Sequence, residues 1–178
     1  MKAILLDRPD ARPVLSTDLP VPAPCADEIL IRVQASSVNP VDNAIANGMF
    51  KGIFEHEFPI TLGRDYAGTV EHAGADVDRL SNTDEVFGFI PPARPVVRDG
   101  AWSELVVVPE SLVAHRPGNV DLATAGAAPL AASTAMTAVD ALALSPEDTV
   151  LIMGATGGVG SFAVQLAAAA GATVIAPA

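Results

Sequence analysis

The sequence predicts a small, mainly β barrel or sandwich followed by the first βαβ unit of an α/β domain. From residue 1 to about 116, short apolar runs rich in β-branched residues alternate with glycine, proline and other turn residues. Beyond that point alanine-rich stretches, which favour helices, surround two further apolar runs and a glycine-rich turn. We therefore expect two domains, at 1–116 and 117–178.

Within the N-terminal domain the apolar runs have the length and composition of strands, and the prolines and glycines between them mark turns. One short helix is expected at Pro40–Ala46, and loops are expected at Phe50–Pro59 and Pro91–Gly100. The predicted strands are Lys2–Leu6, Glu28–Ser36, Gly68–Ala73, Glu85–Ile90 and Ala101–Val108.

The C-terminal part has the order of elements of a βαβ unit, preceded by helices. Parallel strands are normally covered by helices on both faces, and one unit supplies too few elements to do this. We therefore expect a homo-oligomer or a missing C-terminal half to cover the strands. The predicted elements are helices at Leu122–Ala128 and Ala131–Ala143, a turn at Pro146–Asp148, strands at Thr149–Met153 and Thr173–Ala176, and a helix at Ser161–Ala170 that ends at Gly171.

Charge and cysteine content narrow the possible partners. Ten Lys and Arg against 21 Asp and Glu give a net charge of -11, which argues against nucleic acid or an anionic membrane as a partner. No apolar stretch approaches the ~20 residues of a membrane helix, and the N-terminus lacks the apolar region of a secretory signal. The single cysteine, Cys25, forms no internal disulfide. We expect a cytoplasmic protein.

A glycine-rich turn between the first C-terminal strand and its helix is the strongest motif. A turn of this kind, between a strand and a helix, predicts a dinucleotide site, because backbone N–H groups at the helix start can hold a pyrophosphate. The end of the second strand, Ala176–Ala178, lacks the acidic residue that binds the ribose of NAD, which favours NADPH. The cofactor-binding residues of the turn are Gly154, Ala155, Thr156, Gly157, Gly158, Val159 and Gly160.

Together, several segments resemble the medium-chain dehydrogenase/reductase superfamily, in particular its zinc-free quinone oxidoreductase branch. The resemblance implies a GroES-like barrel, the beginning of a Rossmann domain, and hydride transfer from NADPH to a quinone or an α,β-unsaturated carbonyl. The segments that carry it are Ala35–Asp42, Leu62–Val70, Asp84–Gly88, Gly100–Glu104, Ser133–Ala135 and the glycine turn.

The same resemblance assigns roles to individual residues. It implies that Asn39 and Asp42 lie beside the nicotinamide and the substrate, with Asn39 donating to a developing enolate oxygen, and that Thr134 contacts the nicotinamide. Zinc-binding relatives have a cysteine and a histidine where this chain has Asn39 and Arg64, so no metal is expected. As an alternative, the segment 39–42 is only a turn and a helix cap.

Other candidates leave alternatives open. Tyr66 is the only tyrosine and is a candidate catalytic group, although a core position is at least as plausible. Trp102 is expected in the core, and His56 is a weak candidate for a substrate contact. A different class of function also remains, in which the chain is a non-catalytic module that pairs with a second chain.

Overall fold

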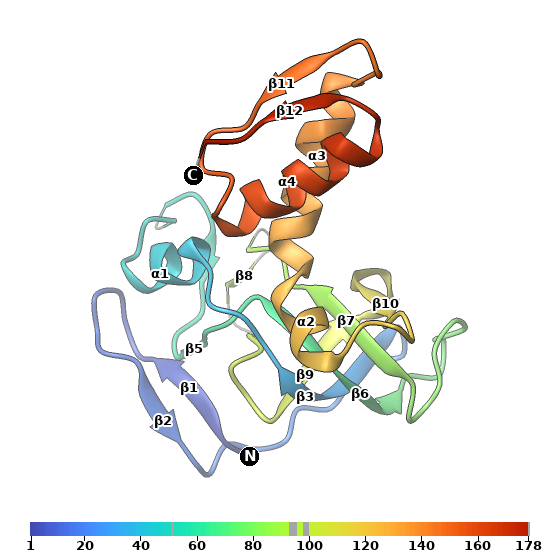
Figure 1. Cartoon of the computed structure of the whole chain (residues 1–178). Coiled ribbons are helices and arrows are strands. Elements are labelled where there is room, and N and C mark those ends of the chain that lie inside the picture. Colours follow the sequence, from blue (N-terminus) through green and yellow to red (C-terminus); the bar gives the residue numbers. More distant parts are fainter. Residues whose placement is uncertain (51, 93–95, 98–99, 178) are drawn as a thin grey trace. The chain divides into compact units, whose positions relative to one another are not determined.

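In the computed structural model, residues 1–50, 52–92, 96–97 and 100–177 are described. The chain divides into two compact units, Met1–Ala127 and Ala128–Ala178 (Figure 1), and each is described by itself. Helix α2 (Leu122–Ala127) packs against strands of the first unit and belongs to it. The predicted boundary after residue 116 follows the change in composition and stays a prediction.

Two antiparallel sheets dominate the first unit. The larger has the strand order β10-β7-β6-β3-β9, and the smaller has the order β2-β1-β5. The short parallel pair β4–β8 lies outside both sheets. The elements are β1 (Ala3–Leu6), β2 (Val14–Ser16), β3 (Glu28–Ala35), α1 (Pro40–Ala46), β4 (Glu55–His56), β5 (Ile60–Thr61), β6 (Asp65–Ala73), β7 (Glu85–Phe89), β8 (Val96–Val97), β9 (Leu105–Pro109), the 3-10 turn Glu110–Leu112 and β10 (Val113–His115).

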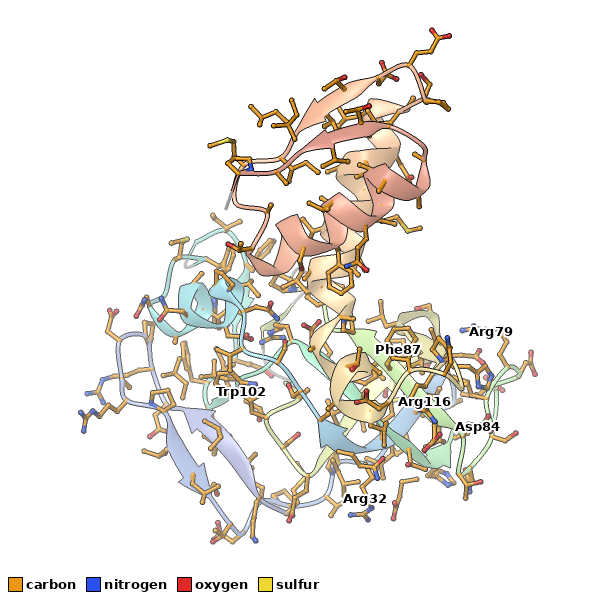
Figure 2. All side chains as sticks on the ribbon, viewed as in Figure 1. Arg32, Arg79, Asp84, Phe87, Trp102 and Arg116 are labelled. Carbon is orange, nitrogen blue, oxygen red and sulfur yellow. The ribbon has the colours of Figure 1, made fainter. Side chains whose placement is uncertain are left out.

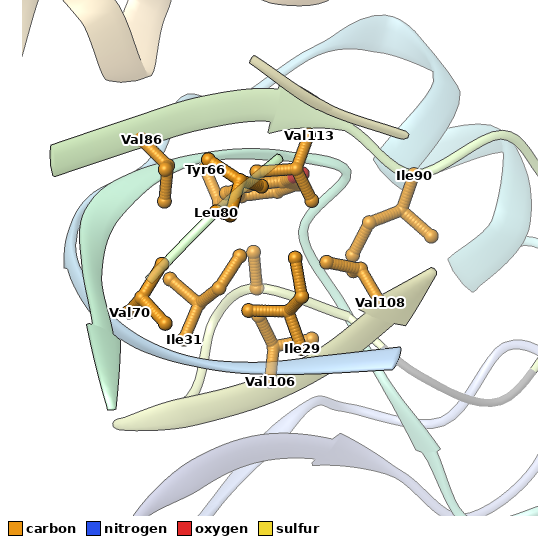
Figure 3. Close-up of a cluster of buried hydrophobic side chains, with 11 residues drawn as sticks. Ile29, Ile31, Tyr66, Val70, Leu80, Val86, Ile90, Val106, Val108 and Val113 are labelled. Carbon is orange, nitrogen blue, oxygen red and sulfur yellow. The ribbon is translucent and has the colours of Figure 1, made fainter. Parts of the chain in front are cut away.

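The five-stranded sheet encloses the main core, shown in Figure 3. Strand β3 directs Ile29 and Ile31 inward, and its register places Val108 and Val106 of β9 opposite them. Alternating apolar residues on neighbouring strands therefore meet on one face, as the period of a strand requires. The cluster consists of Ile29, Ile31, Tyr66, Val70, Leu80, Val86, Ile90, Ala101, Val106, Val108 and Val113.

A second cluster joins the small sheet to α1. Its buried members are Leu6 on β1, Ile45 on α1, Ile60 on β5 and Leu62 just beyond that strand. Trp102 and several phenylalanines pack around them. Helix α1 is thus anchored to the first unit through its buried face, which fixes the turn that precedes it.

The second unit is a helix followed by one βαβ unit. It consists of α3 (Pro129–Leu142), β11 (Thr149–Leu151), α4 (Gly158–Ala169) and β12 (Thr173–Ile175). The two strands are parallel and in register, and α3 packs against α4. Among the described residues, the buried apolar side chains of this unit are alanines together with Pro129.

Most of the predicted elements are confirmed, with differences at short strands and element ends. The sequence missed β2, β5 and β10, and β4 interrupts the predicted loop Phe50–Pro59. The predicted strand Ala101–Val108 starts later, at Leu105, because Ser103 makes only a single bridge to Ala3. The predicted loop Pro91–Gly100 contains β8 and otherwise lies partly outside the described residues.

Helix α4 begins at Gly158 rather than at Ser161, because the glycines that the sequence assigned to the turn already form its first residues. Over the described ranges, none of the helices has the length and apolar character needed to cross a membrane.

Candidate functional site

The turn before α1 carries two of the predicted site residues. Asn39 has an extended backbone and is the N-cap of α1, and Pro40 follows as the first helical residue. Asp42, at the third helical position, accepts the backbone N–H of Asn39 at 2.7 Å, so the two residues form a capping box. The predicted helix cap is therefore present, and it holds both side chains in place.

The side-chain amide of Asn39 points into the protein. Its Nδ2 donates to Ser37 Oγ at 2.7 Å and to Asp65 Oδ2 at 2.8 Å. An amide nitrogen carries two hydrogens, so both are used. In this structure both hydrogens go to protein acceptors, and the expected donation from Asn39 to an enolate oxygen stays a prediction.

Buried charges surround this turn. Asp42, Arg64 and Asp65 are each at most 1% exposed. Burial raises the pKa of Asp42, while the N–H of Asn39 and the positive charge of Arg64 act in the opposite direction. Burial outweighs these two effects, so the pKa of Asp42 is raised.

Tyr66 belongs to the core and not to a ligand site. Its side chain is 0% exposed within the main cluster, and its hydroxyl donates to the carbonyl oxygen of Leu112 at 2.7 Å. Burial raises its pKa well above the ordinary value. The expectation of a catalytic Tyr66 is therefore wrong, and the core position that the sequence left open is the one observed.

The glycine turn of the second unit connects β11 to α4. Gly154 has a φ of +73°, which only glycine adopts without strain. A Cβ on Gly160 would lie 2.1 Å from the carbonyl oxygen of Gly154, so the turn also requires glycine there. Gly157, the N-cap of α4, offers no side-chain cap, and the first N–H groups of the helix therefore have no side-chain acceptor from it. Such a helix start binds phosphate readily.

Thr134 lies on α3, about one helical turn after Ala131, and Ala131 lies near the start of α4. Ala131 Cβ is 3.6 Å from the position that a Cβ would take on Gly158. The hydroxyl of Thr134 donates to the carbonyl oxygen of Leu130 at 2.7 Å, and the side chain is exposed. Thr134 and the glycine turn thus belong to one unit, whereas Asn39 and Asp42 belong to the other.

Two residues that the sequence did not single out for this role complete the network around Asn39. Ser37 donates to Asp65 Oδ2 at 2.5 Å, and Asp65 occupies the first position of β6. Trp102, which was expected in the core, is half-buried against the second cluster and donates from its ring N–H to the carbonyl oxygen of Ser37 at 2.9 Å. In the sequence, the only signal for this network was the charged pair Arg64–Asp65 at the start of an apolar run. Charged side chains that are buried need polar partners, so this pair indicates a network of hydrogen bonds.

Several arginines of the first unit form ion pairs with glutamates. Arg32 forms two hydrogen bonds with Glu71, and Arg79 and Arg116 pair with Glu110 and Glu85. Figure 2 shows these arginines at the edge of the unit, away from Trp102. Among the described residues, no group of three or more His, Cys, Asp or Glu could hold a metal ion.

Residues 25–118 match the alcohol dehydrogenase GroES-like domain, and the chain belongs to this family. Its relatives place it in the medium-chain dehydrogenase/reductase superfamily, as the sequence resemblance implied.

Three similar proteins illustrate the relationship. The chain is 36% identical over 156 residues to a chloroplastic quinone-oxidoreductase homolog of Spinacia oleracea, covering 84% of this chain and 46% of that protein. The quinone oxidoreductase structure from Coxiella burnetii matches with 32% identity and a TM-score of 0.87, over 100% of this chain and 56% of that one. A mycobacterial structure in complex with NADPH matches with 29% identity and a TM-score of 0.83, over 99% and 52%. The chain thus spans about half the length of such proteins.

Proposed function

We propose that this chain forms part of an NADPH-dependent oxidoreductase that transfers a hydride to a quinone or an α,β-unsaturated carbonyl without zinc. The observation that carries the proposal is the glycine turn at the start of α4, in a chain whose relatives are quinone oxidoreductases. A reduced nicotinamide supplies the hydride when it is bound, and the protein orients it.

The residues of the second unit fit the pyrophosphate of a dinucleotide. A Cβ on Gly157 or Gly158 would find backbone or small side-chain neighbours no closer than 3.3 Å, so the backbone here is open to an approaching ligand. The N–H groups of Gly158, Val159 and Gly160 begin a twelve-residue helix, whose dipole favours a negative charge. Thr134 stays the proposed contact to the nicotinamide.

The preference for NADPH rests on the end of β12. Ala176 and Pro177 follow this strand, where NAD-binding folds place an acidic residue against the ribose hydroxyls. Without that carboxylate, a 2′-phosphate meets no negative charge at this position. The similarity to a structure in complex with NADPH supports the same choice.

Zinc does not fit the residues around Asn39. A catalytic zinc needs three ligands of histidine, cysteine or carboxylate type. Here Arg64 contributes a buried positive charge beside Asp42, and a divalent cation would be repelled by it. We therefore propose a metal-free site, in which Asn39 and Asp42 lie at the nicotinamide end.

Cofactor titration of the 178-residue chain tests the proposal. NADPH should raise the midpoint temperature of thermal unfolding of the second unit. At a concentration of a hundred times Kd, the cofactor should add about 2.7 kcal/mol to the free energy of unfolding. Gly160→Ala should abolish the effect, because its Cβ would collide with the carbonyl oxygen of Gly154. Gly118→Ala is the matched control, since a Cβ there meets nothing within 4 Å.

No stabilisation by millimolar NADPH would contradict the proposal. A tenfold preference for NADH over NADPH, about 1.4 kcal/mol, would contradict its cofactor assignment alone. The relative from spinach is chloroplastic by name, so the cytoplasmic expectation for this chain stays a prediction.

A further inference from the structure

Strand β9 has one edge that no strand of the described chain covers. It is the last strand of the five-stranded sheet, and among the described strands it pairs with β3 alone. Near its ends, the backbone of Glu104 accepts a hydrogen bond from Val33 of β3, and that of Glu110 donates one to the residue before β3. In an antiparallel pair such bonds fall on every second residue. The backbone N–H and C=O groups of Leu105 and Val107 therefore point away from β3.

A cavity of about 440 Å³ follows this outer edge. Leu105, Val106 and Val107 all line it. Successive side chains of a strand point to opposite faces of the sheet, so three residues in a row line a cavity only where it runs along the edge of the strand. The side chain of Val106 lies in the main core (Figure 3), and the cavity therefore meets this residue at its backbone.

The walls of the cavity are mostly apolar and belong to the first unit. Leu105 and Val106 are 7% and 3% exposed, so the edge of β9 lies at the bottom of a recess and not on the open surface. The sheet of a second folded copy is too broad to enter such a recess, whereas a single extended segment of chain fits it. The apolar residues of the walls are Leu19, Pro20, Pro22, Phe58 and Pro59.

The sequence of β9 does little to protect this edge against pairing. Edge strands are normally blunted by charged residues, prolines or bulges. Strand β9 reads Leu-Val-Val-Val-Pro, with its proline at the end, and its register against β3 is regular. The hydroxyl of Ser103 donates to the C=O of Leu105 at 2.9 Å and so supplies one bond that a further strand would otherwise make. The N–H of Leu105 and both backbone groups of Val107 are left for a partner strand.

We propose that the outer edge of Leu105–Val107, together with these walls, is a strand-acceptor groove. It binds an extended segment of polypeptide with apolar side chains, which adds to the five-stranded sheet as a further strand. Main-chain hydrogen bonds to Leu105 and Val107 hold the segment, and its side chains contact the prolines and Phe58 of the walls. The chain spans about half the length of its relatives, and the segment that fills the groove comes from the other half of such a protein.

A synthetic peptide tests the groove on the 178-residue chain. The probe is acetyl-Thr-Val-Thr-Val-Thr-amide at millimolar concentration, and its control is the same peptide with the three central nitrogens methylated. The control keeps the side chains but loses the main-chain donors. The first peptide should slow hydrogen exchange of the Leu105 and Val107 amides by about threefold or more, as expected when about two-thirds of the sites are occupied. The Val106 amide, which bonds to β3, should be unaffected.

Val107→Pro tests the same contact from the side of the protein. It removes the outward N–H but no hydrogen bond to β3, and proline is tolerated at such an edge position. The peptide should then no longer slow exchange at Leu105. Val107→Thr is the matched control, because it keeps both the N–H and the β-branched shape. If Val107→Pro does not fold, the methylated peptide still tests the main-chain bonds.

Three results would overturn the inference. Equal protection by the two peptides would show that the cavity takes apolar groups of any kind. No protection by the unmethylated peptide would show that the edge accepts no strand. A Leu105 amide that exchanges as slowly as that of Val106 in the free chain would show that its N–H already has a partner. The groove lies in the first unit and the glycine turn in the second, so none of these results depends on NADPH binding.

Discussion

The two units bury very different side chains. In the first, strands from two sheets enclose isoleucines, valines, leucines and a tyrosine that are fully buried. In the second, the buried apolar positions among the described residues are alanines and one proline, while Leu151 and Ile175 on the paired strands are 59% and 53% exposed. Because apolar burial supplies most of the free energy of folding, the first unit should be more stable than the second.

This difference also separates two kinds of site. The network around Asn39 is built from side chains anchored in a packed core, so its geometry depends on burial and hydrogen bonds. The glycine turn depends on backbone conformation alone and needs few large side chains. The first unit therefore contributes a network of buried side chains, and the second contributes a backbone turn. The predictions below test this contrast.

The largest effect is expected from Ile31→Ala in the main core. Ile31 is 0% exposed, and removing its side chain should lower the free energy of unfolding by about 2–5 kcal/mol. Urea unfolding followed by far-ultraviolet circular dichroism measures it, since this signal reports the helices and strands of both units. Ile175→Ala is the matched control, and a comparable loss there would show that the two units do not differ in this way.

Tyr66→Phe should have a smaller effect of about 1–3 kcal/mol, because it removes the partly buried hydrogen bond that the Tyr66 hydroxyl donates to the carbonyl oxygen of Leu112. The ring and its packing remain. Binding of NADPH at the glycine turn should be unchanged, and a specific loss of binding would restore a functional role for the hydroxyl. Urea unfolding and cofactor titration give both quantities.

The pH dependence of stability should change with Asp42→Asn. Burial raises the folded-state pKa of Asp42, so its stabilising contribution is present below its unfolded pKa of about 3.9 and is lost as the pH rises through the folded value. The substituted amide can still accept the N–H of Asn39 through its oxygen but does not ionise. The free energy of unfolding of the variant, relative to that of the wild type, should therefore increase between acid and neutral pH.

Asp121→Asn provides a control of opposite sign for that measurement. Hydrogen bonds from Thr124 lower the pKa of Asp121, so its contribution is present above the unfolded pKa and is lost as the pH falls through the folded value. Urea unfolding at about pH 4 and pH 7 compares the two variants. The same sign for both would show that Asp42 is not governed by burial.

Leu151→Ser should change stability least, by about 0.5 kcal/mol or less, because the side chain is 59% exposed. We propose that a second copy or another chain covers these strands, so the substitution should reduce self-association in light scattering. Hydrogen exchange sharpens the test, because strand amides that lack a cover exchange readily. A strict monomer with strongly protected amides in β11 and β12 would contradict this view.

The sequence was sufficient for the parts of the fold that depend on local patterns. The β-branched run of β3 and the helix α1 have local signals and form where they were predicted, and the glycine turn forms after β11 but ends earlier than predicted, at the start of α4. Strands of two or three residues, such as β2 and β5, exist only through pairing with β1, which no local pattern encodes. The resemblance drew attention to Asn39, whose role at a site stays a prediction, and the orientation of its amide depends on Asp65, 26 residues away along the chain.

Tyr66 and Gly88 form a contact with an evolutionary consequence. A Cβ on Gly88 would lie 2.3 Å from the hydroxyl oxygen of Tyr66 and 2.7 Å from the ring carbon that carries it. Even a phenylalanine at position 66 would therefore collide with an alanine at position 88. The same Cβ would lie 2.3 Å from the backbone carbonyl oxygen of Leu112, so a smaller residue at position 66 would not make room for it. In a library in which both positions are randomised and folded clones are selected, position 88 is therefore expected to stay glycine whatever residue stands at 66.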